Sequence, residues 1–121
     1  MIMKGNKQLK VVLRQIVEKN FRDPSFNVSK LGLFIRISRA SINRKFKKLY
    51  HCDPREYIED IRLEYAKKKL EEDDDSIIKE IAFEAGFADA KYFSVKFKQK
   101  YMITPSEFKK QNQEKMIVEI S

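Results

Sequence analysis

Basic side chains gather in two short segments of this 121-residue chain, and their types suit phosphate binding and base recognition. Residues 36–50 hold six basic and no acidic side chains, and residues 91–100 hold four basic and no acidic ones. Lysine and arginine neutralise phosphate charge, while arginine and asparagine can each form two hydrogen bonds with one base edge. Asn43 and Arg44 stand side by side in the first segment. This chemistry indicates contact with a nucleic acid.

The two basic segments belong to an internal repeat whose copies are offset by 51 residues. Residues 46–57 read FKKLYHCDPREY and residues 97–108 read FKQKYMITPSEF, with Phe, Lys, Tyr, Pro and Glu at matching places. A repeat in a short chain predicts two structural units of one kind. Because a short helical pattern and a turn precede each copy, we expect each unit to be a helix–turn–helix that ends in a basic helix.

Apolar residues recur at helical spacing along the chain, which predicts an all-α fold of seven helices in two helix–turn–helix units joined by a long linker helix. The clearest start signals are Asp53–Pro54 and Thr104–Pro105, each with Glu three residues after the cap. Beyond Gln111 the pattern fades, and Met116–Ile120 either packs back onto the protein or forms a tail. The predicted helices are 8–20, a second capped by Asn27, a third capped by Ser38, a fourth over 54–71, a fifth from Ser76, a sixth from Asp89 or Ala90, and a short seventh after Thr104.

The charge distribution follows the predicted elements. We expect four parts, namely residues 1–52 as the first helix–turn–helix unit, 53–72 as the linker helix, 73–111 as the second unit and 112–121 as a C-terminal tail. Residues 51–90 carry a net charge of −7, although the whole chain carries +8. A basic surface that served only solubility would not separate the charges in this way. Clustered Lys and Arg on particular helices is the electrostatic footprint of phosphate binding.

The sequence lacks the motifs expected for catalysis, metal binding or membrane insertion. Cys52 is the single cysteine and His51 the single histidine, so neither an internal disulfide nor a zinc set can form. The acidic run 71–75 lacks the central glycine and the spaced acids of a calcium loop. A Gly-rich phosphate loop, a nucleophile elbow and an apolar run of about 18 residues are also absent. We therefore expect no enzyme, metal, cofactor, small-molecule site or membrane span. Because Met1–Lys4 lacks the apolar core of a signal peptide, the expected location is the cytoplasm.

The ordered motifs of the second unit resemble the DNA-binding domain of AraC/XylS-type transcription regulators. They comprise residues 81–89, IAFEAGFAD, then Tyr92, Phe93, Ser94, Phe97 and Lys98, and finally residues 104–108, TPSEF. Residues 38–47, SRASINRKFK, resemble the first recognition helix of that family, and Arg62, Leu63, Ala66 and Leu70 resemble its linker helix. The resemblance covers residues 9–110 and implies seven helices in two units that bind duplex DNA in bacteria.

The resemblance also carries expectations about the whole regulator. Family members usually attach this domain to another that senses a small molecule, dimerises or receives phosphate. The chain is therefore expected to be either an excised DNA-binding fragment or a small stand-alone regulator. Its second half also resembles the output domains of hybrid two-component regulators. The implied partners are double-stranded DNA and RNA polymerase, with the fragment itself monomeric and any dimerisation through another domain.

The helical wheel and the resemblance agree on the base-reading positions of the first recognition helix. When Ile42, Phe46 and Leu49 face inward, positions 39, 40, 43, 44 and 47 face outward. Arg44 could form a bidentate contact with guanine, and Asn43 with an adenine edge, while Ala40 could touch a thymine methyl. The expected base-reading set of the first unit is Arg39, Ala40, Asn43 and Arg44. For the second unit the resemblance implies Ala90, Lys91, Ser94 and Val95.

Two positions depart from the family pattern. Val95 stands where the family often has arginine, so the second unit should read fewer hydrogen-bonding edges. Arg36 stands where glycine is common in the turn of the first unit. Either that turn adopts a conformation that tolerates arginine, or strain is accepted in order to place a charge near the phosphates.

Phosphate contacts are expected beside the base-reading positions, because such contacts position a protein on DNA without specifying sequence. The candidates are Ser38, Lys45, Lys47, Lys48, Lys96, Lys98 and Lys100. Each single lysine could equally be a solvated surface residue. If the linker helix is rigid, the two recognition helices should enter neighbouring segments of the major groove, about 34 Å apart.

Two other interpretations stay open at this point. A helical protein-interaction module could bind an acidic partner, such as a polymerase subunit, through the same basic faces. An RNA-binding domain is the second alternative. Sequence-specific RNA modules usually expose aromatic residues for stacking, whereas the aromatic residues here occupy inward positions.

Overall fold

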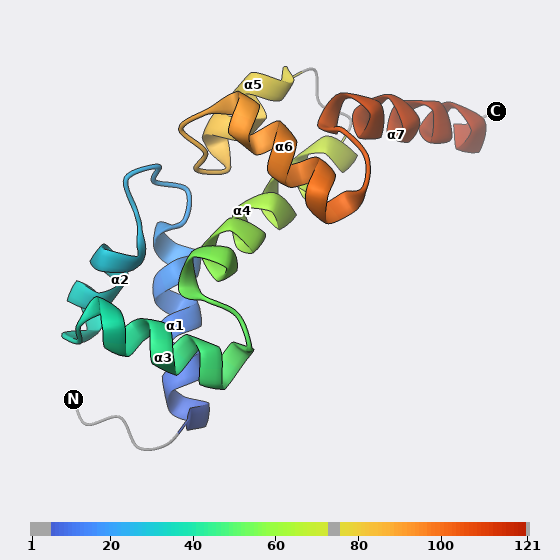
Figure 1. Cartoon of the computed structure of the whole chain (residues 1–121). Helices are drawn as coiled ribbons and strands as arrows, with labels where there is room; N and C mark the ends of the chain where they lie inside the picture. Colours follow the sequence, from blue (N-terminus) through green and yellow to red (C-terminus); the bar gives the residue numbers. More distant parts are fainter. Residues whose placement is uncertain (1–5, 73–75, 121) are drawn as a thin grey trace. The chain divides into compact units, whose positions relative to one another are not determined.

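A computed structural model describes residues 6–72 and 76–120 of the chain (Figure 1). Over these residues the chain forms seven α-helices and no strand, which confirms the predicted all-α fold. The helices are α1 (Asn6–Asn20), α2 (Val28–Ile35), α3 (Arg39–Tyr50), α4 (Pro54–Glu71), α5 (Ile78–Glu84), α6 (Ala90–Tyr101) and α7 (Pro105–Ile120). Among the described residues, none of these helices is both long enough and apolar enough to cross a bilayer.

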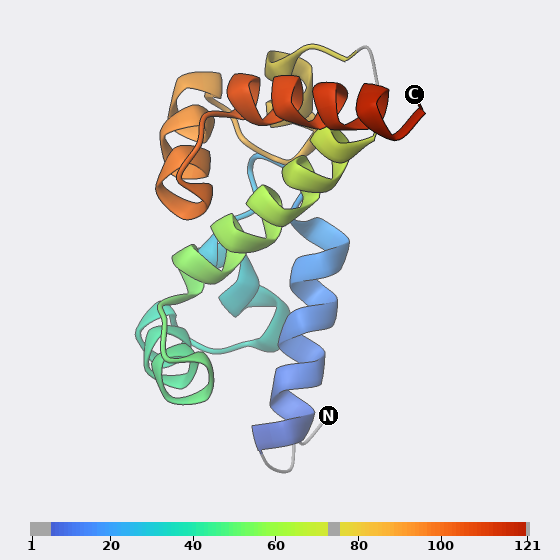
Figure 2. The same ribbon diagram turned by 90° about the vertical axis from the view of Figure 1, so that its right-hand side faces the viewer.

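The chain forms two compact units that divide between Ile61 and Arg62, inside α4. Unit 1 ends at Ile61 and holds α1, α2, α3 and the first half of α4. Unit 2 begins at Arg62 and holds the second half of α4 with α5, α6 and α7. Figure 2 shows α4 as one continuous helix that contributes to both units. Each unit contains one helix–turn–helix, formed by α2 and α3 in unit 1 and by α5 and α6 in unit 2.

The core of unit 1 fixes the rotation of α3 about its own axis. Ile42, Phe46 and Leu49 are all buried, as the helical spacing predicts. These positions lie on one stripe of the helix, so its opposite face remains exposed. The rest of this core consists of Leu9, Leu13, Val17, Phe26, Val28, Leu31 and Ile58.

The core of unit 2 holds α6 in the same way. Phe93 and Phe97 have no exposed surface, while Tyr92 and Tyr101 are half-buried beside them. The same core contains Leu63, Ala66, Leu70, Ile81, Ala82, Ala85 and Phe87. Both recognition-type helices are therefore anchored by aromatic residues at matching places in the repeat.

The internal repeat produces equivalent aromatic contacts in the two units. The ring centroids of Phe46 and Tyr57 lie 5.3 Å apart with an interplanar angle of 69°. Those of Phe97 and Phe108 lie 5.8 Å apart at 65°. Both are edge-to-face pairs, the geometry that the ring quadrupoles favour. They fasten α3 to the start of α4 and α6 to the start of α7, so the aromatic stripes serve packing, as predicted.

The predicted caps of α4 and α7 are confirmed. The Asp53 carboxylate accepts a hydrogen bond from the backbone N–H of Glu56 at 2.8 Å. The Thr104 hydroxyl accepts one from the backbone N–H of Glu107 at 3.2 Å. Each cap satisfies an N–H group that the first helical turn would otherwise leave without a partner.

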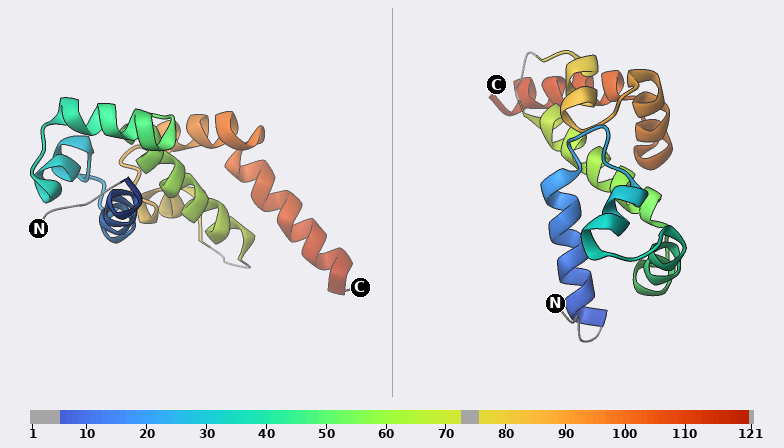
Figure 3. Two further views of the ribbon diagram at one scale, coloured as in Figure 1. Left: turned by 90° about the horizontal axis from the view of Figure 1, so that it is seen from below. Right: turned by 90° about the vertical axis from the view of Figure 1, so that its left-hand side faces the viewer.

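Three helix boundaries differ from the sequence prediction. α1 begins at Asn6, two residues before the predicted start at residue 8. α5 begins at Ile78, two residues after the predicted start at Ser76, and the Ser76 carbonyl instead accepts a hydrogen bond from Lys109 Nζ at 2.5 Å. α7 does not stop near Gln111 but continues to Ile120 (Figure 3). Residues 111–120 contain no proline or glycine that would end a helix, although they have lost the apolar periodicity. Asp73, Asp74 and Asp75 of the acidic run lie outside the described residues.

The turns of the two helix–turn–helix units share one hydrogen-bond pattern. The backbone N–H of Ile37 donates to the Gly32 carbonyl at 3.0 Å, and that of Phe87 donates to the Ala82 carbonyl at 2.9 Å. Each pair is the six-residue closure of a helix C-terminus that requires a left-handed residue. That residue is Arg36, with φ of 58°, in unit 1 and Gly86, with φ of 99°, in unit 2.

The turn of unit 1 is one residue shorter than that of unit 2. The cap of α3, Ser38, follows two residues after Arg36, whereas the cap of α6, Asp89, follows three residues after Gly86. In the shorter turn the backbone comes close to α2. A Cβ atom added at Gly32 would lie only 2.7 Å from the carbonyl oxygen of Ile37. Glycine at this position therefore permits the close approach.

We expect Gly32→Ala to lower the free energy of unfolding, because the turn must move to admit the methyl group at a cost of about 1–3 kcal/mol. This cost should exceed the ~1 kcal/mol that alanine ordinarily gains over glycine within a helix. Urea unfolding followed by circular dichroism measures the change. The matched variant Ala82→Gly, which has no such clash, should lose about 1–2 kcal/mol from helix propensity and a lost buried methyl. A Gly32→Ala protein as stable as the wild type would show that the close approach is not required.

Candidate nucleic-acid interface

The outward face of α3 carries the base-reading positions predicted for unit 1. The Ser38 hydroxyl accepts a hydrogen bond from the backbone N–H of Ser41 at 3.2 Å and fixes the start of the helix. The side chains of Arg39, Ala40, Asn43 and Arg44 are all exposed. Ala40 and Arg44 lie opposite the buried stripe, Asn43 lies on its flank, and Arg39 lies at its edge. All four therefore occupy the exposed first half of α3.

A short chain of hydrogen bonds directs the Arg44 guanidinium toward the start of α3. Arg44 Nη2 donates to the Ser41 hydroxyl at 3.2 Å, and the Ser38 hydroxyl donates to the same oxygen at 3.0 Å. The sequence prediction did not include Ser41, although the spacing of three residues places these three side chains on one side of the helix. A recognition helix presents its N-terminal residues to base edges. Ser41 thus holds the Arg44 guanidinium near the N-terminal end of α3.

The corresponding face of α6 is less exposed and less basic at its start. Lys91 and Val95 are exposed, whereas Ala90 and Ser94 are half-buried. The Asp89 carboxylate caps the helix by accepting from the backbone N–H groups of Lys91, at 2.8 Å, and Tyr92, at 3.3 Å. A carboxylate at this end opposes an approaching phosphate, whereas the Ser38 cap of α3 is neutral.

The lysines predicted to contact phosphate fall into two groups. Lys45, Lys47, Lys48 and Lys98 are exposed. Lys96 and Lys100 are half-buried and lie over the rings of Tyr92 and Tyr101, at 5.6 Å and 5.5 Å from the ring centroids. Lys100 Nζ also lies 3.6 Å from a carboxylate oxygen of Glu64, which offsets part of its charge. The basic surface of unit 1 is therefore more open than that of unit 2, and the phosphate contacts themselves stay predictions.

Tyr50 anchors the C-terminal end of α3. Its hydroxyl donates a hydrogen bond to the Lys10 carbonyl of α1 at 3.2 Å, and its ring centroid lies 4.7 Å from that of Tyr57. Burial raises the pKa of Tyr50 above its ordinary value. Burial, reinforced by the neighbouring Tyr50, raises the pKa of Tyr57 as well. The two phenols thus form a neutral pair that holds α3 against α1 and α4 within unit 1.

Cys52 lies two residues after the end of α3 and does not have the properties of a reactive thiol. Burial raises its pKa, and the carboxylates of Glu56, Asp60 and Asp53 raise it further. A thiol surrounded by negative charge stays protonated at neutral pH and is a poor nucleophile.

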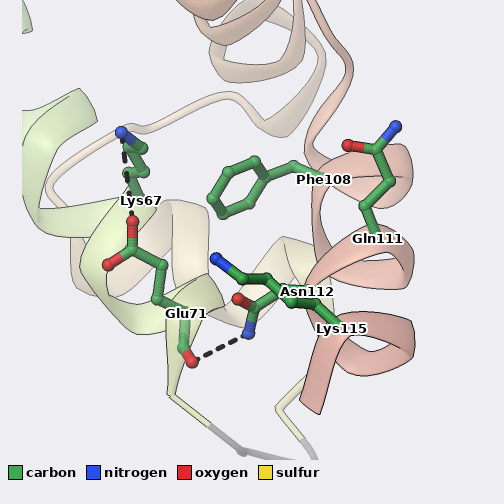
Figure 4. Close-up of a pocket in the computed structure, with 6 residues that line it drawn as sticks. All are labelled: Lys67, Glu71, Phe108, Gln111, Asn112 and Lys115. Carbon is green, nitrogen blue, oxygen red and sulfur yellow. Dashed lines mark hydrogen bonds and ion pairs between the residues drawn. The ribbon is translucent and has the colours of Figure 1, made fainter. Parts of the chain in front are cut away.

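A groove of about 500 Å³ in unit 2 lies between the second half of α4 and α7 (Figure 4). Within it, Lys67 Nζ lies 3.9 Å from a carboxylate oxygen of Glu71, and the Asn112 amide donates to the Glu71 carbonyl at 2.8 Å. The second contact satisfies a carbonyl at the C-terminus of α4. These side chains fasten α7 to α4, so we assign the groove a structural role. Its lining residues are Lys67, Glu71, Phe108, Gln111, Asn112 and Lys115.

Comparison with known proteins identifies the family. A family model described as a helix-turn-helix domain matches residues 34–111, well over half of the chain. The chain belongs to the AraC-type helix-turn-helix family. The matched segment of this AraC-type chain contains all the base-reading and phosphate positions predicted above.

Two relatives of this AraC-type chain and one structural neighbour illustrate the match. The HTH-type transcriptional regulator MtrA of Neisseria gonorrhoeae is 27% identical over 116 residues, which cover 94% of this chain and 38% of that protein. The C-terminal domain of the two-component response regulator YesN from Fusobacterium nucleatum is 32% identical, with a TM-score of 0.79 over 84% of this chain and 97% of that one. The DNA-binding domain of AdpA, solved in complex with a target DNA, shares the fold with a TM-score of 0.78 and 19% identity, over 87% and 93% of the two chains. The chain thus spans well under half of the length of MtrA.

The tyrosine pair predicts a loss of stability at alkaline pH. Both phenols have a higher pKa in the folded protein than the value of about 10 expected in the unfolded chain. This difference stabilises the fold fully below about pH 10, and the stabilisation is lost as the pH rises through the folded-state pKa values. We expect the melting temperature to fall steadily above about pH 10, and to fall less steeply in Tyr57→Phe. Calorimetry measures the melting temperature against pH. If it falls equally steeply in the wild type and in Tyr57→Phe, ionisation of Tyr57 does not contribute to the loss of stability.

Proposed function

We propose that the chain binds double-stranded DNA sequence-specifically through the outward faces of α3 and α6, as the DNA-binding part of a bacterial transcription regulator. The observation that carries this proposal is the division of each of these helices into two faces. The apolar stripe is buried in its own unit, while the basic side chains of residues 36–50 and 91–100 stand outside, at least partly exposed and without an acidic residue among them. Phosphate neutralisation by such a face provides affinity for any duplex.

Base recognition would come from the N-terminal halves of the two helices. On α3, Asn43 and Arg44 each can form paired hydrogen bonds with one base edge, and Ala40 can touch a thymine methyl. On α6, Lys91 and Ser94 can form single hydrogen bonds, and Val95 can touch a thymine methyl. Arg39 and Ala90 complete the proposed base-reading set. Phosphate contacts from Ser38, Lys45, Lys47, Lys48, Lys96, Lys98 and Lys100 would fix the position of the two helices on the duplex.

The family and the relatives support a wider proposal about the regulator. Residues 1–52 and 73–111 would act as two DNA-binding units joined by the helix of residues 53–72, with residues 112–121 as a C-terminal extension. Their half-sites would lie in adjacent major-groove segments, centred about one helical turn apart. The likeness to the C-terminal domain of YesN favours an output role in a two-component system. We further propose that the regulator acts in the bacterial cytoplasm and contacts RNA polymerase, that this chain is monomeric by itself, and that dimerisation involves another domain.

Selection of binding sites from a random duplex pool tests the proposal directly. We expect a single enriched motif and tight, salt-dependent binding to it. If about six phosphates are neutralised, log K should fall with log salt at a slope near −5, from roughly −0.9 per phosphate. Failure to enrich any duplex, or a slope shallower than about −2, would instead favour a protein-interaction module. Preference for single-stranded RNA over duplex DNA would favour the RNA-binding alternative.

Arg44→Ala should reduce binding to the selected site by about 1–3 kcal/mol and relax the preference at one base pair. The reason is the loss of the bidentate contact that Ser41 helps to orient. Lys48→Ala is the matched control on the same helix, since it should weaken binding to selected and random duplexes by the same factor. Competition binding on both duplexes measures the difference. If Arg44→Ala weakens both duplexes equally, Arg44 contacts only phosphate.

The two half-sites should be unequal, because α6 has Val95 where α3 has Arg44. We expect one sharply defined half that responds to substitutions in α3, and a vaguer half that tolerates thymine. Val95→Arg should sharpen the vaguer half toward guanine by about 1–3 kcal/mol of discrimination. Repeating the site selection with the variant measures this change. A wild-type motif with two equally sharp halves would contradict the proposed order of the units.

A further inference from the structure

Arg36 adopts a backbone conformation that its side chain disfavours. It ends α2 with φ of 58° and ψ of 42°, which is the left-handed region. An L-residue with a Cβ atom enters this region at a cost in free energy, whereas glycine enters it freely. The equivalent residue of unit 2 is Gly86, with φ of 99°. The arginine therefore occupies the left-handed position of the turn without reshaping it.

The fold of unit 1 gives no reason for an arginine at this position. Only backbone groups close the turn, since the N–H of Arg36 donates to the Leu33 carbonyl at 3.3 Å and the N–H of Ile37 donates to the Gly32 carbonyl. Glycine would make the first of these bonds equally well. The Arg36 side chain is exposed and contributes nothing to the core. His51 and Met102 adopt the same left-handed conformation, so what needs a functional reason at position 36 is the charge of the exposed side chain.

The position of Arg36 along the chain indicates which role. It lies two residues before Ser38, the cap of α3, and so beside the end of the helix that presents Arg39, Ala40 and Asn43. All six charged side chains in residues 36–50 are basic. Phosphates line both edges of any major-groove segment that a helix enters. The planar guanidinium group is the side chain best suited to bind phosphate through two parallel hydrogen bonds.

We propose that Arg36 binds a backbone phosphate at the edge of the groove segment read by α3, and that the strained turn is retained because it places the guanidinium there. The proposal rests on DNA binding through α3, as proposed above. It makes Arg36 a positioning residue of unit 1 that has no counterpart in unit 2, where Gly86 offers neither charge nor strain. The contact would add affinity for every duplex and no preference for any base.

The decisive experiment combines thermal melting without DNA and binding to the selected duplex across a range of salt concentrations. Arg36→Gly removes both the strain and the charge. It should raise the melting temperature by about 2–4 °C. It should also make the salt slope shallower by about 0.9 and weaken binding about eightfold near 0.1 M salt, on selected and random duplexes alike. A residue with a merely structural role would not change stability and affinity in opposite directions.

Two matched variants separate charge from strain. Arg36→Lys keeps the charge and the strained backbone, so it should keep the wild-type salt slope. His51→Gly relieves the same left-handed strain at the other end of α3, where φ is also 58°, and should raise the melting temperature without weakening binding. Wild-type affinity and slope in Arg36→Gly would overturn the proposal, as would a lower melting temperature in that variant. Wild-type protein that binds no duplex would instead refute the proposed function itself.

Discussion

The burial of one apolar stripe on the second helix of each helix–turn–helix unit is the constraint on which the rest of the structure depends. Phe46 in α3 and Phe97 in α6 have no exposed surface, and full burial of such a side chain stabilises a protein by about 1.5–3 kcal/mol. Turning either helix by one residue would expose its phenylalanine and bury a charged or polar side chain, which is costly without a partner. The cores therefore decide which face of each helix meets solvent. The polar surface of Asn43 and Arg44 is available for recognition because of this packing.

The two units use one scaffold for different surfaces. Their aromatic pairs, the caps of α4 and α7, and the turn hydrogen bonds match, because the same core must form twice. Core packing does not constrain the exposed positions, and these differ between the units where DNA would be contacted. Arg36 of the first turn corresponds to Gly86 of the second, and Arg44 of α3 corresponds to Val95 of α6. The basic lysines of α6 are also more engaged with their own unit, as the pair of Lys100 with Glu64 shows. These differences support the proposal that unit 1 provides most of the preference for a DNA sequence.

The spacing of apolar residues along the sequence was enough to predict the helices and their buried faces. Features that depend on backbone conformation, on side-chain rotamers or on contacts between helices were not predicted. Helical periodicity and the repeat predicted the buried faces of α3 and α6, and hence the exposure of Arg44. The left-handed conformation of Arg36 was left undecided, because it depends on a backbone closure that does not require a particular side chain. The bond from Arg44 to Ser41 depends on a side-chain rotamer, and the pair of Lys100 with Glu64 joins two helices. The full length of α7 was missed because its last turns carry no apolar pattern, although nothing in their sequence stops the helix.

The proposed function requires the outward faces of both α3 and α6 to contact DNA. Titration of the isotope-labelled chain with its selected duplex, followed by amide chemical-shift mapping, tests it most directly. The largest shift changes should occur at the turn around Arg36, over residues 38–48 of α3 and over the first half of α6. Changes along the acidic first half of α4 should be small. Changes confined to one unit, or centred on that acidic segment, would contradict the account.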